Sequence, residues 1–278
     1  MGNQISRAQF LAVSSFLVNF SVQTYGMLSS PNTKQVADAN HFAFSPNPWF
    51  IAAFFSGQVA LQVYWIRQLF NLNGEGYRRL DVPPPNTSRP LNKSMAEINE
   101  EAVKTALDYV PVYALGNLCI AGWLFFWLRE NFAASQVLVT INTVAQLLAV
   151  VRLPPLTASS SRLLLLTHLV ANTFAGIGVL DFIDNGGVAL VTLSCTPSTL
   201  VQALTCILFP IATAASTPLF GSILLYDILA IFAGQWPVAG AGEWTARLGW
   251  TALGMGVIVW LNGLTSLRNM RTSSASVC

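Results

Sequence analysis

Three aspartates lie in strongly apolar parts of this sequence, where a carboxyl group could act as an acid or a base. Asp227 lies within the stretch GSILLYDILAIFAG, and Asp181 and Asp184 lie in GIGVLDFIDNGG. No basic residue lies in the interior of any apolar stretch long enough to span a membrane. Burial without a cation favours the neutral form of a carboxyl, which is a ready general acid. We predict Asp227 as a catalytic acid, with Asp181 or Asp184 as its catalytic partner.

These carboxyls also have structural interpretations. Asp227 could be a buried carboxylate paired with an arginine, although its own helix supplies no cation. Asp181 and Asp184 could instead lie in a solvated loop, because Asn185-Gly186-Gly187 is a typical turn sequence. If the helix continues past them, their i, i+3 spacing places both on one face.

Aromatic residues near these acids could form the walls of a substrate cavity. Tyr226 is next to Asp227 in the sequence, and Trp123 and Trp127 end a span on the same predicted side of the membrane. Aromatic faces stabilise a cation through their quadrupole. The alternative for the tryptophans is an aromatic belt at the membrane interface.

Polar residues four apart recur inside the apolar stretches, so that each pair shares a helical face. We predict that His168 and Asn172 contact the substrate in a polar-lined interior, and the alternative is hydrogen bonding that holds the helices together. The pairs are Asn19 and Gln23, Gln58 and Gln62, Asn142 and Gln146, His168 and Asn172, and Ser198 and Gln202.

Several familiar catalytic motifs are missing from the sequence. It has no GxSxG, HExxH or Walker A pattern, and none of its four cysteines forms a CxxC. Two histidines are too few for a multi-histidine metal site. Asp181 and Asp184 give a single D-x-x-D, whereas holding a magnesium diphosphate in the membrane would use two aspartate-rich motifs. We therefore expect no metal and no cofactor.

The elements that must position these residues are transmembrane helices. Apolar residues make up 53% of the 278 and charged residues only 9%, against about a quarter charged in soluble domains. A span needs about 20 largely apolar residues. We predict one all-α membrane domain, residues 1–278, of about eight spans, with seven as the alternative: 9–28, 47–70, 109–128, 133–151, 163–181, 188–210, 211–233 and 247–265.

The sixth and seventh predicted spans meet at Phe209-Pro210-Ile211, where proline favours a break, and Pro197 and Pro218 interrupt them internally. With the boundary between the two spans at Pro210, Asp227 lies in the lumenal third of the seventh span. A cleaved signal peptide is the alternative for the first span, but no A-x-A cleavage site follows it.

Basic residues set the expected orientation, because they are enriched in cytoplasmic loops. Eight spans with both termini cytoplasmic leave only Lys34, Arg129 and Arg247 on the other side, out of fourteen basic residues. Residues 71–105 then form a cytoplasmic loop with a short surface helix at 94–104, begun by a Ser94/Glu97 capping box. The expected location is the endoplasmic reticulum membrane.

Two modification signals lie on the predicted cytoplasmic side. The start, Met1-Gly2-Asn3-Gln4-Ile5-Ser6, fits the pattern for myristoylation of Gly2, and a plain polar start is the alternative. The glycosylation sequons at Asn86 and Asn92 would remain unmodified in the cytoplasm.

The stretches NPWFIAAFFSGQVALQVYWIRQLF and FAGIGVLDFIDNGG resemble a fungal family of polytopic membrane proteins. The layout of spans also resembles the membrane-bound terpene cyclases of ascofuranone/ascochlorin-type meroterpenoid pathways. This resemblance covers the span pattern and these two segments and includes no diagnostic catalytic motif. It implies a secondary-metabolism enzyme, an isomerase or lyase, that opens a terminal epoxide on a prenyl chain by acid and lets the cation cyclise without a metal.

The expected partners are a lipophilic small-molecule substrate, membrane lipids and other membrane biosynthetic enzymes. No nucleic acid is expected, because the net charge is only +2 and no basic run occurs. The alternatives are a small-molecule transporter, whose features include proline-interrupted helices and a polar core, or a non-catalytic membrane scaffold. No four-plus-four internal repeat supports the transporter.

Overall fold

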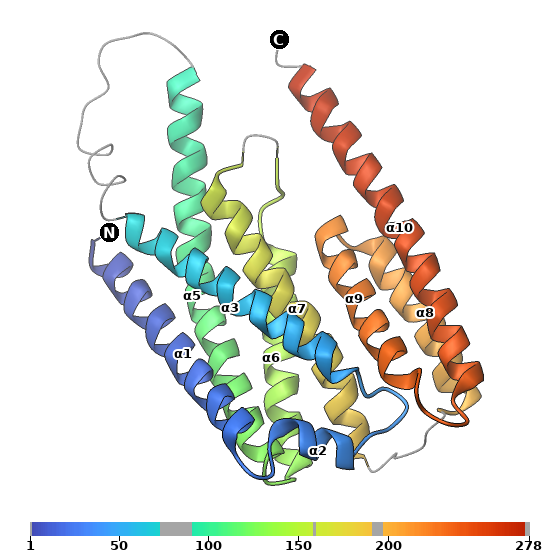
Figure 1. Cartoon of the computed structure of the whole chain (residues 1–278). Helices are drawn as coiled ribbons and strands as arrows, with labels where there is room; N and C mark the ends of the chain where they lie inside the picture. The colour runs from blue at the N-terminus through green and yellow to red at the C-terminus, as the bar shows by residue number, and fades with distance from the viewer. Residues whose placement is uncertain (1, 73–90, 158–159, 191–196, 276–278) are drawn as a thin grey trace.

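Long helices run up and down through the molecule in the computed structural model, which describes residues 2–72, 91–157, 160–190 and 197–275. Their order can be followed by colour in Figure 1. The helices are α1 Gly2–Leu28, α2 Thr33–Ala39, α3 Pro48–Asn71, α5 Leu91–Trp127, α6 Phe132–Arg152, α7 Arg162–Ala189, α8 Thr199–Ala215, α9 Pro218–Gln235 and α10 Gly242–Ala275.

Seven of the described helices are long and apolar enough to cross a membrane, namely α1, α3, α5, α6, α7, α9 and α10. Helix α8 is also apolar but has only 17 residues. The chain is therefore an integral membrane protein with an all-α helical bundle, which confirms the predicted fold class.

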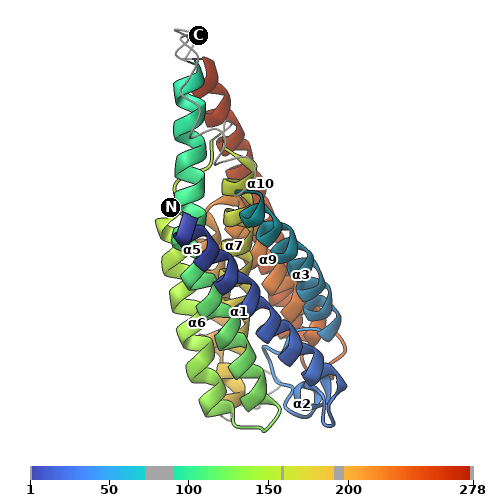
Figure 2. The same cartoon turned by 90° about the vertical axis from the view of Figure 1, so that its left-hand side faces the viewer.

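The helices other than short α2 alternate in direction, so that the N-terminus and the C-terminal part of α10 point toward one end of the bundle (Figure 1). We call this the terminal end, and the opposite end, where α2 lies, the loop end. Figure 2 shows α5 and α10 extending beyond the other helices at the terminal end. Lys34, Arg129 and Arg247 lie at or near the loop end, as the predicted division of basic residues requires.

The boundary predicted at Pro210 is wrong. Pro210 lies inside α8, and the chain turns instead at Ser216 and Thr217. Proline is tolerated within membrane helices because neighbouring groups satisfy the freed carbonyl. Pro218 does not interrupt a helix either, because it occupies the first turn of α9, where its missing N–H costs nothing.

Two further boundaries differ from the prediction. Helix α7 continues through Asn185-Gly186-Gly187 to Ala189, so the turn expected there is absent. Its packing against neighbouring helices overrides the weak helix preference of glycine. Helix α5 is continuous from Leu91, so Ser94 does not begin a separate surface helix. Residues 73–90, with most of the predicted cytoplasmic loop and Asn86, lie outside the described residues.

The segment between α2 and α3, residues 40–47, is buried against the bundle at the loop end. Phe42, Ala43, Phe44 and Ser45 are all less than one tenth exposed. Backbone carbonyls of this α2–α3 loop accept hydrogen bonds from α9 and α10, with Gln235 Nε2 at 2.9 Å from the Phe42 oxygen and Trp244 Nε1 at 2.7 Å from the Ala43 oxygen. These bonds supply the partners that a loop buried in an apolar setting requires.

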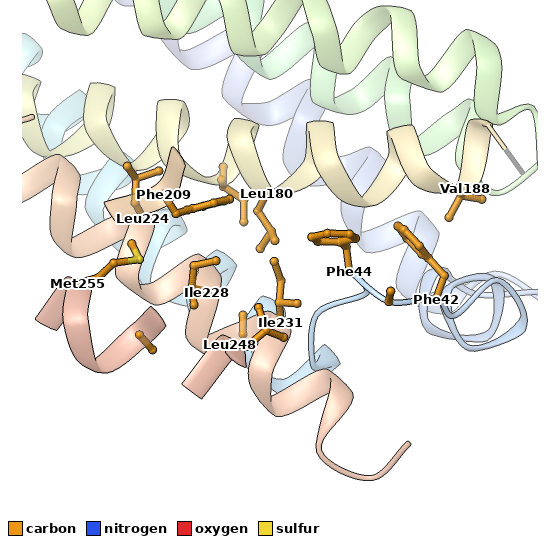
Figure 3. Packing of buried hydrophobic residues seen from close by; sticks show 14 of the residues in the cluster. Phe42, Phe44, Leu180, Val188, Phe209, Leu224, Ile228, Ile231, Leu248 and Met255 are labelled. Atoms are coloured by element: carbon orange, nitrogen blue, oxygen red, sulfur yellow. The ribbon is translucent and has the colours of Figure 1, made fainter. Parts of the chain in front are cut away.

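The apolar core at this end joins α7, α9 and α10 to the loop. Figure 3 shows Leu180 of α7 facing Ile228 and Ile231 of α9, with Phe44 and Phe42 of the loop alongside. The core therefore surrounds the part of the bundle in which Asp181 and Asp227 lie.

Candidate functional site

Asp227 is the tenth residue of the 18-residue helix α9. Thr217 caps that helix by accepting a hydrogen bond from the Phe220 N–H at 3.2 Å, and Pro218 follows in the first turn. Because α9 begins at Pro218, Asp227 lies at the middle of its helix, which is deeper than the lumenal third predicted from the sequence.

The Asp227 side chain is enclosed by protein and has no polar partner. Its exposed fraction is 0%, and neither carboxyl oxygen has a hydrogen-bond partner among the described residues. Its helical neighbours Leu224, Ile228 and Ile231 are buried apolar residues. The ion pair between Lys34 and Asp38 lies on the surface of α2, away from this helix. An isolated carboxylate is costly in such surroundings, so the neutral acid is the favoured form.

Helices α7 and α9 run in the same direction, and their glycine contacts fix their register. The side chain of Ile223 fills the space above Gly176, and the backbone of the α2–α3 loop lies against Gly234. Phe42 of the same loop fills the space at Gly187. The Ile223–Gly176 contact joins residues 47 apart in number, and Asp227 lies about one turn further along α9, near the level of residues 180–181 of α7.

This register brings the three predicted carboxyls into one region. Asp227 is within electrostatic range of Asp181, and Asp181 is within electrostatic range of Asp184. Asp181 and Asp184 are one turn apart on the continuous helix α7, so they share a face, and both are half-buried. Ser45 of the α2–α3 loop donates a hydrogen bond to Asp184 Oδ1 at 3.1 Å.

Tyr226 connects α9 to α3 beside the acid. Its hydroxyl donates to the Phe50 carbonyl oxygen at 2.7 Å, and its ring lies 5.4 Å from the Phe50 ring and 5.7 Å from the Phe54 ring. These three aromatic rings stand where α3 meets α9, and Tyr226 directly precedes Asp227 in the sequence.

Trp123 and Trp127 belong to the apolar core that contains Leu180 and Ile228. Their rings are 5.7 Å apart. Trp123 Nε1 donates to Asn185 Oδ1 at 3.1 Å, while the buried Trp127 Nε1 has no partner among the described residues. Their predicted role as cavity walls stays a prediction. Two other tryptophans, Trp49 and Trp236, are largely exposed, as an interfacial belt requires.

His168 and Asn172 lie away from the carboxyls. Thirteen residues separate His168 from Asp181 along α7, which corresponds to about 20 Å. His168 Nε2 is 2.8 Å from the Pro154 oxygen, and Asn172 Nδ2 donates to the His168 carbonyl at 2.7 Å. The structure does not bring this pair together with Asp227, and its predicted role in substrate binding stays a prediction.

The other predicted polar pairs mostly form hydrogen bonds between helices. Asn19 of α1 donates to Asn117 Oδ1 at 2.7 Å, Tyr113 of α5 donates to Gln62 Oε1 at 2.7 Å, and Tyr109 donates to Gln146 Oε1 at 2.9 Å. Ser198 instead caps α8, and Gln202 Nε2 donates to the Pro197 oxygen. The interpretation as interhelical hydrogen bonding therefore fits three of the five pairs.

A metal site needs several ligands close together. Across the described parts of the chain, no group of three or more His, Cys, Asp or Glu residues is arranged to hold a metal ion. Asp181, Asp184 and Asp227 thus share a region without forming a metal-binding cluster. That the chemistry needs no cofactor stays a prediction.

No family model, curated protein or solved structure matches the chain. The site is therefore interpreted from its own residues.

The sequence analysis missed the residues of the α2–α3 loop and their partners. Ser45, Gln235 and Trp244 are buried polar residues that hold this loop against α7, α9 and α10. One signal was available, because Asn32 and Gln35 form a reciprocal capping box that begins α2 and so marks an ordered segment before α3. Asn185 was assigned to a turn, yet it accepts from Ser135 at 2.6 Å and ties α7 to α6.

Proposed function

We propose that this protein is a membrane terpene cyclase of secondary metabolism that acts on an epoxidised prenyl or meroterpenoid substrate. The observation that carries the proposal is Asp227, a fully buried carboxyl at the middle of an apolar helix with no hydrogen-bond partner among the described residues. Intramembrane carboxyls are costly and usually functional. A neutral carboxyl in apolar surroundings suits a substrate that is itself lipophilic.

The proposed cyclisation uses Asp227 as the acid and Asp181 or Asp184 as the base. Asp227 gives its proton to the epoxide oxygen, and the bond from that oxygen to the more substituted carbon breaks. The π electrons of the prenyl chain attack the resulting cation, and a new carbon–carbon bond closes the ring. Asp181 or Asp184, as a carboxylate, removes a proton from a carbon next to the final cation, and a double bond forms. Substrate and product are isomers, so the proton count balances.

The surroundings of Asp227 support this chemistry in two ways. Buried apolar side chains such as Leu180 and Ile228 exclude water, which would otherwise capture the cation. The rings of Tyr226, Phe50 and Phe54 cluster where α3 meets α9, on the helix that carries Asp227, and aromatic faces stabilise a positive charge. Removing a buried acid that must protonate the substrate would therefore remove most of the activity.

We further propose that both termini are cytoplasmic and that the membrane is that of the endoplasmic reticulum. The uneven distribution of basic residues supports this orientation. The α2–α3 loop and Asp184 would then lie toward the lumen.

The test is conversion of an epoxidised prenyl substrate in microsomes, normalised to intact protein. Asp227→Asn keeps the shape but removes the transferable proton, so turnover should fall about 10²- to 10⁴-fold. Asp227→Glu keeps a proton and should retain part of the activity. The matched control is Asp38→Asn, which removes a surface carboxyl of α2. Near-normal conversion by Asp227→Asn would remove the proposed acid.

A proton-coupled small-molecule transporter is the second candidate. The observation that favours it is the set of three carboxyls within membrane-spanning helices, since such groups also form proton relays in transporters. Reconstituted vesicles discriminate between the two, because a transporter accumulates unchanged substrate when a proton gradient is applied, whereas a cyclase yields an isomer with or without one.

A further inference from the structure

The surroundings of Asp227 differ sharply between the two ends of the bundle. Toward the terminal end, the facing residues of α9 are Leu224, Ile223 and Phe220, and all are buried and apolar. The matching residues of α7, Ile177 and Phe174, are also apolar and have exposed fractions of 0%. Apolar side chains cannot pass a proton, and the buried Thr143 hydroxyl on this side is engaged with the Gly178 and Val139 carbonyl oxygens.

Toward the loop end, ionisable and hydroxyl groups follow one another. Asp181 lies level with Asp227 in the register of α7 and α9, and Asp184 lies one turn nearer the end. Ser45 Oγ then contacts Asp184 Oδ1 at 3.1 Å. Asp184 is five residues, about 8 Å, from the end of α7, and it is half-buried, whereas Asp227 is fully enclosed.

Three hydrogen bonds hold Ser45 in place. Its hydroxyl oxygen accepts from the Phe42 N–H at 3.1 Å while it donates to Asp184, and its carbonyl oxygen accepts from Gln235 Nε2 at 3.1 Å. One residue of the loop thus contacts both α7 and α9. A carboxyl held by such a bond keeps one orientation.

None of these carboxyls forms an ion pair with a described residue, and the Lys34–Asp38 pair lies on α2. His41 is the ionisable residue of the α2–α3 loop itself, four residues before Ser45. Tyr226 is the ionisable residue beside Asp227 on α9, and its hydroxyl is engaged with the Phe50 carbonyl. On α10, Glu243 and Arg247 are exposed. Helices α3 and α6, which also border this region, have their described charged residues, Arg67 and Arg152, near the opposite end.

We propose that protons reach Asp227 from the loop end, through Asp184 and Asp181, and that Ser45 is a positioning residue for Asp184. A proton from solvent binds Asp184, an O–H bond breaks there as another forms on Asp181, and the same exchange then protonates Asp227. Neither transfer joins carboxyls that are hydrogen-bonded to each other at rest in the described structure, so each uses a side-chain rotation or a bridging water. Within the proposed cyclase, which this inference deepens, the same path returns to Asp227 the proton that Asp181 or Asp184 has taken from the final cation, and it exchanges that proton with solvent.

The test is hydrogen–deuterium exchange of the Asp227 carboxyl, followed by infrared spectroscopy of the purified protein in lipid after transfer to deuterated buffer. The carbonyl band of a protonated carboxyl shifts on exchange, and Asp227→Asn identifies the band by removing it. Asp184→Asn should slow the exchange about tenfold or more by breaking the relay. Ser45→Ala should slow it about three- to tenfold, the factor that one hydrogen bond is worth.

Two variants separate the relay from a general change in structure. Ser45→Thr keeps the hydroxyl and should keep the normal exchange rate. Thr167→Val removes a buried hydroxyl from α7 on the terminal side of Asp181, and exchange should be unchanged. Unaltered exchange in Asp184→Asn, equal slowing in Thr167→Val, or the absence of any band removed by Asp227→Asn would overturn the proposal. The measurement needs no substrate, so failure of the proposed cyclase activity would not be confused with failure of the relay.

Discussion

Replacing Asp227 with valine should make the protein more stable while abolishing its function. Both carboxyl oxygens are buried without a described partner, and burying a polar group in that state costs about 1–3 kcal/mol. Valine has a similar size and no polar atom, so it removes this cost with little strain. Residues at functional sites commonly show such a conflict between stability and activity.

This change in the free energy of unfolding can be compared with that expected at a buried residue whose polar atoms all have hydrogen-bond partners. Asn185 Oδ1 accepts from Trp123 and Ser135, and its Nδ2 donates to the Phe132 carbonyl and to Gln136. Asn185→Val would leave the Trp123 N–H and the Ser135 hydroxyl without this partner. The free energy of unfolding should therefore fall by about 2 kcal/mol or more.

The assay is thermal unfolding in detergent micelles, followed by the fluorescence of the eight tryptophans. For a chain of this size, a change of about 1 kcal/mol in the free energy of unfolding shifts the midpoint by about 3 °C. Asp227→Val should therefore raise the midpoint by about 3–9 °C, and Asn185→Val should lower it by about 6 °C or more. A midpoint for Asp227→Val that falls as far as that of Asn185→Val would refute the reasoning, because it would mean that the carboxyl has partners that stabilise the fold.

Three further predictions concern topology, lipidation and the α2–α3 loop. Reporter fusions at both termini should report cytoplasm, and Asn86 and Asn92 should carry no glycan in microsomes; a glycan on either would reverse the orientation. Gly2→Ala should abolish incorporation of labelled myristate while the protein stays in the membrane fraction, and release to the soluble fraction would contradict the spans. Gly234→Ala should lower the unfolding midpoint and detach the α2–α3 loop, because the added Cβ would strike the loop backbone. Detachment should appear as faster proteolysis near Ser45. The control is Gly57→Ala, whose added Cβ meets open space, and it should change neither the midpoint nor the proteolysis.

The fold was predictable because membrane helices are specified by length and apolar composition, which a sequence displays directly. The errors came from residues whose local preference is weak compared with packing. Pro210 and the Asn185-Gly186-Gly187 sequence both suggested a break, yet neighbouring helices keep α8 and α7 intact across them. Local rules describe an isolated segment and take no account of such neighbours.

The site was predictable only in part. Asp227 could be found because a carboxyl within an apolar helix is conspicuous, and Asp181 and Asp184 could be placed on one face by their spacing. Ser45 could not be found, because a serine in a connecting segment has no pattern of its own. Its bond to Asp184 joins residues 139 positions apart, and only the packed structure brings them together.

The short helix α8 has a consequence for the lipid around the protein. Its 17 residues span about 26 Å, less than the average hydrocarbon thickness of about 30 Å, and its largely exposed side chains include Leu200, Ile207, Leu208 and Ile211. A span of this length matches a thin bilayer, such as that of the endoplasmic reticulum at about 27 Å, and has a mismatch of several ångströms in the thicker plasma membrane. If α8 spans the membrane, lipids beside it would have to compress in the thicker bilayer, at a cost that rises with each ångström of mismatch.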